Sequence, residues 1–105
     1  MFIENEGKMS ISKQFIELSV GMMGFRKAGE DGPPIVFLHG IPTSSFLWRK
    51  VVDDLQKDFT CYAIDMLGYG DSDKPVGKDL SIQAQSDYVV QWAMAVGLND
   101  FHLVG

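Results

Sequence analysis

Hydrophobic and polar residues alternate with a period of two near the start of the chain, which is typical of a β-strand that is buried on one face. In residues 13–20 the two alternating sets are Phe15, Glu17 and Ser19 against Ile16, Leu18 and Val20. A second run, residues 22–29, follows Gly21, so the pattern predicts a hairpin of two strands. Residues 30–34 contain Asp-Gly and Pro-Pro, which predict a turn.

Beyond residue 34, short apolar runs alternate with amphipathic segments. The runs at residues 35–39, 59–65 and 101–105 are predicted to be strands buried on both faces. Two segments between them have a helical period, residues 46–57 and a stretch that begins near Ser81. Their predicted buried residues are Leu47, Trp48, Val51, Val52 and Leu55 in the first helix, and Ile82, Val89, Trp92, Ala93 and Val96 in the second.

Local signals mark where these helices begin and end. Thr43, Ser44 or Ser45 can cap the first helix, and Gly97 is placed to end the second. Residues 66–79 are rich in Gly, Asp and Pro and are predicted to form a long loop. The order strand, helix, strand, helix, strand predicts the α/β class: parallel strands joined by crossover helices, with the antiparallel hairpin at one edge.

Composition narrows the possible functions. At 105 residues the chain forms at most one domain, and its net charge of −5 with scattered basic residues argues against nucleic-acid binding. The single cysteine, Cys61, suits a reducing compartment. The first residues have no apolar core of a signal peptide, and no stretch is long enough to span a membrane. We therefore expect a cytoplasmic protein without a membrane partner.

The residues also argue against a metal or nucleotide cofactor. His39, His102 and Cys61 do not have the spacing of metal ligands. "GYGDSD" lacks the third glycine of a dinucleotide-binding fingerprint. We expect no cofactor and no metal.

The loop "HGIPTSS", residues 39–45, is the first candidate for chemistry because it follows a predicted parallel strand. In such sheets, ligands bind at the carboxyl ends of the strands. Gly40 lets the backbone approach a ligand, and Pro42 removes one backbone donor, so the remaining N–H groups have a defined direction. A free N–H there can stabilise a developing anion. His39 can orient the loop through its ring nitrogens.

Three motifs carry a resemblance to a known family. "LHGIPTSSFLWR", "DMLGYGDSDKP" and "FHLVG" occur in this order. Together they resemble the N-terminal portion of α/β-hydrolase fold enzymes, in the branch that holds haloalkane dehalogenases, epoxide hydrolases and related esterases. The resemblance implies that residues 1–105 are the N-terminal segment of a single α/β-hydrolase domain that ends at the nucleophile elbow. The cap and the C-terminal half of the fold would then be absent from this segment.

The resemblance implies a role for each matching residue. The backbone N–H of Ile41 would be one donor of the oxyanion hole, and Gly105 would be the first glycine of the nucleophile elbow. His39, Gly40 and Pro42 would shape the oxyanion loop, and the bond into Pro42 is often cis in such enzymes. The residues that match the family's D-x-x-G-x-G-x-S turn, a chiefly architectural feature, are Asp65, Gly68, Gly70 and Ser72.

The implied function is cofactor-independent hydrolysis through a covalent enzyme intermediate. The nucleophile is expected two residues beyond Gly105, so the 105-residue chain alone is expected to be inactive. Haloalkane dehalogenases of this branch usually carry Asn where this chain has Ile41, and the Asn side chain helps to hold the leaving halide. An ester or epoxide substrate is therefore expected ahead of a haloalkane. A serine nucleophile would imply an acyl-enzyme and an aspartate an alkyl-enzyme ester.

A non-catalytic role is the alternative. In the family the strand at residues 101–105 lies inside the sheet, and an uncovered apolar strand edge tends to pair with another strand. The remainder of the hydrolase chain or a second copy of this chain is the expected partner for that edge. A fragment or binding module of this kind would self-associate through its last strand.

Overall fold

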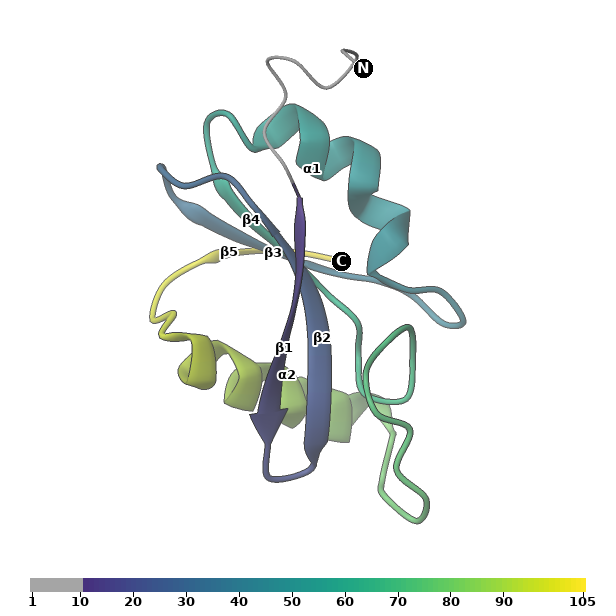
Figure 1. Cartoon of the computed structure of the whole chain (residues 1–105). Coiled ribbons are helices and arrows are strands. Elements are labelled where there is room, and N and C mark those ends of the chain that lie inside the picture. Colours follow the sequence, from purple (N-terminus) through teal and green to yellow (C-terminus); the bar gives the residue numbers. More distant parts are fainter. Residues whose placement is uncertain (1–10) are drawn as a thin grey trace.

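The computed structural model of the protein describes residues 11–105 and contains one five-stranded sheet with helices on both faces (Figure 1). The strands are β1 (Ser12–Leu18), β2 (Gly21–Ala28), β3 (Pro34–Leu38), β4 (Thr60–Ile64) and β5 (His102–Val104). The helices are the 3₁₀ turn η2 (Ser45–Trp48), α1 (Arg49–Leu55) and α2 (Ile82–Val96). Within residues 11–105, none of the helices is long and apolar enough to cross a bilayer.

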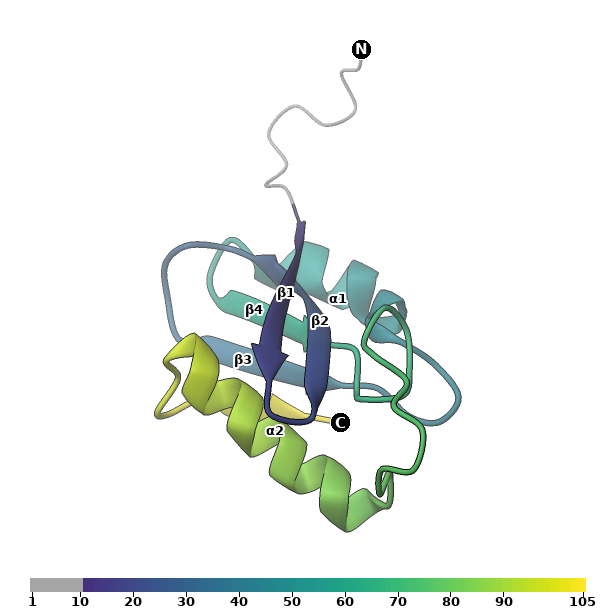
Figure 2. The same ribbon diagram turned by 60° about the horizontal axis from the view of Figure 1, so that its bottom comes forward.

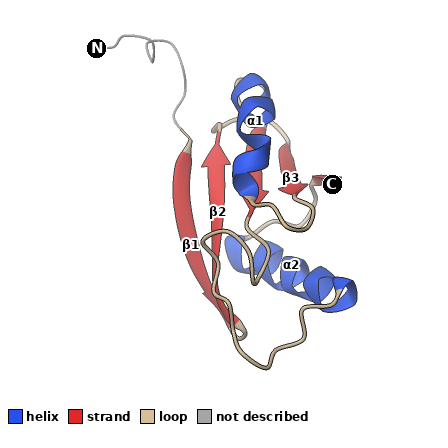
Figure 3. Ribbon diagram, turned by 90° about the vertical axis from the view of Figure 1, so that its right-hand side faces the viewer, coloured by secondary structure: helices blue, strands red, loops and turns tan. Residues whose placement is uncertain are grey.

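The sheet has the order β1-β2-β4-β3-β5 and is mixed. β1 and β2 form an antiparallel hairpin, with β1 at the outer edge (Figure 3), and β2 pairs antiparallel with β4. β4, β3 and β5 run parallel. The predicted α/β class, with an antiparallel hairpin at the edge of parallel strands, is therefore confirmed.

The core consists of two layers because α1 and α2 cover opposite faces of the sheet (Figure 2). On the α2 face, the indole of Trp92 packs edge-on against Phe25 and Tyr62, with ring centres 5.3 and 5.5 Å away. On the α1 face, Val52 packs in a cluster that includes Cys61. Burial raises the pKa of the Cys61 thiol to about 11, so this side chain acts as a small apolar filler.

The helix boundaries follow the local signals. The Ser81 hydroxyl accepts a hydrogen bond from the backbone N–H of Ala84 at 3.2 Å, and Gly97 ends α2 with a φ of 85°. The single helix predicted over residues 46–57 is instead η2 followed by α1. Ser44 caps η2, and the Leu47 N–H bonds to the Ser44 carbonyl, which is the tighter 3₁₀ spacing common at helix starts.

The buried faces of the helices differ from the predicted stripes. Leu47, Val51 and Ile82 were predicted to be buried and are exposed. Two glutamines, Gln56 and Gln85, are buried instead. Gln85 Nε2 donates to the Leu67 carbonyl at 2.7 Å, whereas its Oε1 has no hydrogen-bond partner within residues 11–105. In α2 the buried face is therefore shifted and includes Tyr88, whereas in α1 Val52 is the buried residue.

The last strand was also predicted to be buried on both faces, and this is wrong for the residues described. Leu103 is 58% exposed, and His102 and Val104 are exposed as well. Within residues 11–105, β3 is the only strand that pairs with β5, so one edge of β5 has no partner there.

The difference between Val51 and Val52 gives a direct test of this packing. Val52 is 1% exposed and Val51 is 40% exposed, on the same helix. We expect Val52→Ala to lower the free energy of unfolding by about 2 kcal/mol, because it removes buried methyl groups and leaves a cavity. Val51→Ala should change it by less than about 0.5 kcal/mol. Urea denaturation followed by tryptophan fluorescence measures both, and equal losses would contradict the packing of α1.

Candidate active site

The loop after β3 carries His39 and Gly40 at the carboxyl end of that strand. The His39 ring is buried, and its Nε2 accepts a hydrogen bond from the backbone N–H of Met66 at 2.9 Å. Its Nδ1 lies 2.9 Å from the Gly40 carbonyl oxygen. Because a carbonyl can only accept, these two partners place the ring proton on Nδ1. His39 therefore joins its own loop to the start of the loop after β4.

The turn at Gly40 presents the candidate oxyanion donor. The Thr43 N–H donates to the Gly40 carbonyl at 3.0 Å, which closes a turn that contains a cis Ile41–Pro42 bond. Ile41 is 59% exposed, and within residues 11–105 its backbone N–H donates to no protein acceptor. An N–H without a protein partner is available to a ligand.

A cavity of about 390 Å³ lies beside this loop, between α2 and the carboxyl ends of β3 and β5. Three of the sequence-predicted site residues line it together: His39, Gly40 and Gly105. Its other walls are mostly apolar and include Met66, Val89 and Leu103. Ile41 is not part of this lining, and Pro42 borders a separate hollow of about 450 Å³ that Thr43 and Arg49 also line.

Asp65, directly after β4, holds the neighbouring loop in place. Its carboxylate is fully buried and accepts hydrogen bonds from Lys13 Nζ at 2.5 Å, the Ser45 N–H at 2.7 Å and the Asp71 N–H at 3.0 Å. These donors come from β1, from η2 and from the loop after β4. One carboxylate thus fixes three segments that are far apart in the sequence.

The charge of Asp65 is stable in this setting. Burial raises the pKa of the carboxyl, but the hydrogen bonds from Lys13, Ser45 and Asp71 together outweigh burial and lower it to about 2. Asp65 is therefore ionised at neutral pH, and it neutralises the Lys13 ammonium beside it.

The other residues of the predicted turn are arranged around Asp65. Gly70 has a φ of 55°, and a Cβ there would lie 2.4 Å from the Asp65 carboxyl carbon, so only glycine fits. The Ser72 hydroxyl donates to the Asp65 carbonyl at 2.6 Å and accepts from the Gly24 N–H at 2.8 Å. The Gly68 N–H donates to the Asp73 carbonyl at 2.8 Å. None of the four lines the cavity beside His39.

Two basic residues of this arrangement were missed by sequence reasoning. Lys13 also lies 3.1 Å from the Asp71 carboxylate, and Arg26 Nε donates to the Ser45 hydroxyl at 3.0 Å. They face each other across the hairpin in the β1–β2 register. No local motif surrounds them, so only the register of the sheet could have indicated their role.

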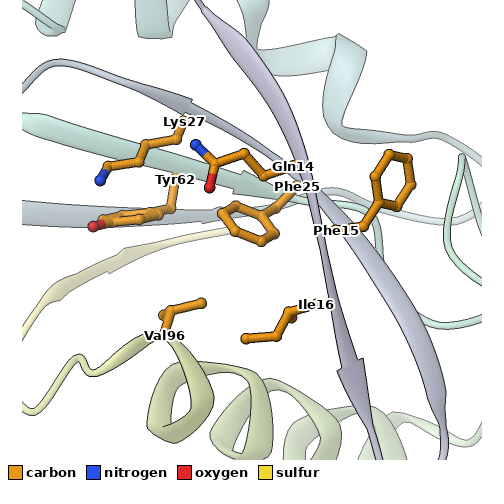
Figure 4. A pocket seen from close by; sticks show the side chains of 7 residues that line it. All are labelled: Gln14, Phe15, Ile16, Phe25, Lys27, Tyr62 and Val96. Carbon is orange, nitrogen blue, oxygen red and sulfur yellow. The ribbon is translucent and has the colours of Figure 1, made fainter.

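A third hollow, of about 250 Å³, is separate from these residues (Figure 4). It lies between the hairpin, β4 and the end of α2, and its lining is Gln14, Phe15, Ile16, Phe25, Lys27, Tyr62 and Val96. None of the sequence-predicted site residues borders it. Within the described part of the chain, no three His, Cys, Asp or Glu residues are grouped to hold a metal ion.

A mixed sheet with a glycine-containing loop and an apolar cavity at the carboxyl ends of its parallel strands is typical of α/β folds that bind ligands at that edge. Comparison with known proteins identifies which one. Residues 33–105 match the family described as alpha/beta hydrolase fold. The chain belongs to the α/β-hydrolase fold family.

Individual relatives agree with this assignment. The chain is 44% identical over 73 residues to a haloalkane dehalogenase of Agrobacterium fabrum. This match covers 70% of this chain and 24% of that protein. It is 35% identical over 81 residues to a fluoroacetate dehalogenase of a Burkholderia species, covering 73% of this chain and 27% of that protein. The chain thus spans about a quarter of the length of these curated relatives.

The fold is also similar to solved structures. A loop variant of a haloalkane dehalogenase from Bradyrhizobium elkanii superposes with a TM-score of 0.85 at 33% sequence identity, covering 90% of this chain and 31% of that one. The structure of a bacterial membrane phospholipase A has a TM-score of 0.86 at 23% identity, covering 89% and 30% of the two chains, which shows a shared fold. The relatives named in these comparisons are hydrolytic enzymes.

The buried carboxylate predicts how stability depends on pH. The pKa of Asp65 is about 2 in the folded state, below its ordinary value of 3.8. The carboxylate therefore stabilises the fold above pH 3.8, and this stabilisation is lost as the pH falls toward the folded-state pKa. We expect this contribution to be about 2 kcal/mol. Wild type should therefore be more stable than Asp65→Asn at pH 5, and this difference in the free energy of unfolding should shrink as the pH falls to 2. Urea denaturation of both proteins measures it.

Asp54→Asn is the control, because Asp54 is exposed on α1. This variant should follow the wild-type pH profile. A difference between wild type and Asp65→Asn that stays constant down to pH 2 would contradict the role assigned to the carboxylate.

Proposed function

We propose that this chain is the N-terminal part of a cofactor-independent hydrolase that acts through a covalent enzyme intermediate, and that the Ile41 N–H supplies half of its oxyanion hole. The observation that carries the proposal is the Ile41 N–H, which has no protein acceptor within residues 11–105 and lies on the loop that follows β3. Family membership and the hydrolytic relatives support the reaction class.

In the proposed reaction, a nucleophile two residues beyond Gly105 attacks the substrate, and either the alcohol of the ester leaves or the C–O bond of the epoxide opens. Water then hydrolyses the covalent enzyme ester and releases the product. Attack on an ester carbonyl places negative charge on the carbonyl oxygen, and the Ile41 N–H donates a hydrogen bond to that oxygen. Removal of one such donor typically lowers the rate by about 10²–10³-fold. The cavity lined by His39, Gly40 and Gly105 would hold the apolar part of the substrate.

An ester or an epoxide is the proposed substrate class. Ile41 has an aliphatic side chain, so it offers no side-chain donor to a leaving halide. Dehalogenation of a haloalkane is the second candidate reaction, and the names of the relatives favour it. The two proposals differ in whether the loop needs a side-chain donor in addition to its backbone donor.

A binding role through β5 is a further candidate of a different class. The exposed Leu103 and the unpartnered edge of β5 among residues 11–105 support it. Such an edge pairs readily with another strand. The proposed partner is the remainder of the hydrolase chain or a second copy of this chain.

The complete protein that contains this segment tests the reaction. We expect it to hydrolyse p-nitrophenyl butyrate or styrene oxide in the presence of EDTA. Under rapid quench, its intact mass should rise by the acyl group of the ester or by the whole mass of the epoxide, which is retained as a hydroxyalkyl ester. Turnover of neither compound, or turnover without a covalent adduct, would contradict the proposal.

Position 41 distinguishes the two substrate classes. We expect Ile41→Asn to raise bromide release from 1-bromobutane, because the amide can donate to the leaving halide, while Ile41→Leu should leave bromide release at the wild-type level. Ion chromatography of released bromide measures both. If wild type already releases bromide faster than it hydrolyses the ester and the epoxide, the dehalogenase candidate replaces the proposed one.

The binding candidate is tested by light scattering of the 105-residue chain at micromolar concentration. Self-association that Leu103→Lys abolishes is the expected result, because a charge on the exposed strand opposes pairing. Val76→Lys is the control and should not affect association, because Val76 is exposed in the loop before α2. A monomer would contradict this candidate.

A further inference from the structure

The Gly40 carbonyl oxygen accepts three hydrogen bonds, more than a turn needs. The donors are the Thr43 N–H at 3.0 Å, the Thr43 hydroxyl at 2.7 Å and His39 Nδ1 at 2.9 Å. The Thr43 N–H alone closes the turn. The hydroxyl and the imidazole are therefore additional donors to one acceptor.

This carbonyl belongs to the same peptide group as the Ile41 N–H. A peptide group is planar, and the Gly40–Ile41 bond is trans, so its C=O and N–H point in opposite directions. Any contact that fixes the direction of the Gly40 oxygen also fixes the direction of the Ile41 N–H. Hydrogen bonds to a carbonyl also polarise its amide, which strengthens the N–H as a donor.

The three donors differ in what else they do. His39 is buried and is tied to Met66, and the Thr43 N–H closes the turn, so both contribute to the loop's conformation. The Thr43 side chain is exposed, and within residues 11–105 its hydroxyl makes no other hydrogen bond. Its contact with Gly40 is therefore the one of the three that can be removed with the least effect on the fold.

We propose that the Thr43 hydroxyl is a positioning group for the oxyanion donor: by binding the Gly40 oxygen, it orients and polarises the Ile41 N–H. This inference rests on the proposed function, because it assigns Thr43 to the same anion site. Thr43 touches no reacting atom; it acts through the Gly40–Ile41 peptide.

Two variants of the complete protein separate this role from a structural one. Thr43→Val keeps the branched shape and removes the hydroxyl, whereas Thr43→Ser keeps the hydroxyl. We expect Thr43→Val to slow the covalent step in single-turnover experiments by about three- to tenfold, the effect of one neutral hydrogen bond, with KM near wild type. Thr43→Ser should restore most of the rate, and the urea midpoint should be unchanged in both variants.

The inference is overturned if Thr43→Val reacts at the wild-type rate, or if Thr43→Ser is as slow as Thr43→Val. It is also overturned if the loss appears only in KM or follows a loss of stability. A merely structural role of Thr43 would give one of these results.

A second measurement keeps the inference independent of turnover. A hydrogen bond to a carbonyl deshields the amide nitrogen of the same peptide group, so the ¹⁵N resonance of Ile41 should move upfield in Thr43→Val and stay in place in Thr43→Ser. If wild type hydrolyses no substrate, the proposed function fails, and this resonance still decides the role of Thr43. An unchanged Ile41 resonance in Thr43→Val overturns the inference.

Discussion

The buried charge of Asp65 is the constraint around which the two loops at the carboxyl ends of β3 and β4 are built. A carboxylate without partners is costly to bury, so it must be surrounded by donors. Here the donors are the ammonium of Lys13 and the backbone N–H groups of Ser45 and Asp71. Because these groups belong to three separate segments, satisfying one charge brings the segments together. Gly70 completes the arrangement, since its missing side chain leaves room for the carboxylate.

His39 provides a second connection between the same two loops. It accepts from the N–H of Met66, the residue after Asp65, and it donates to the carbonyl of Gly40. The loop that carries Ile41 is thus held on one side by the Asp65–Ser45 contact and on the other by the His39–Met66 contact. These fixed supports set the direction of the loop's backbone N–H groups, which is what the proposed function would require of a donor to a developing anion.

Sequence reasoning succeeded where the signal is local and failed where the partner is distant. The strands, the Ser81 cap and the Gly97 end could be predicted because each depends on a few neighbouring residues. The exposure of Leu47 and Ile82 could not, because it depends on which arc of each helix meets the sheet. The resemblance implied one site for His39, Gly40, Ile41, Pro42 and Gly105. Of these, His39, Gly40 and Gly105 line one cavity and the other two do not, and the roles assigned to them stay predictions. Lys13 and the Thr43 hydroxyl were not foreseen, since their contacts require the assembled sheet and the folded turn.

The position of Lys13 has a consequence for how the site assembles. It lies on β1, the edge strand, and its contact with Asp65 joins residues 52 positions apart. Such a long-range contact requires the hairpin to be docked on β4, so the loop after β3 gains this support only when the sheet is assembled. The edge strand is therefore a remote determinant of the site. A fusion or trimming that frays β1 would disturb the loop after β3, because Lys13 contacts both Ser45 of that loop and the Asp65 carboxylate that holds it.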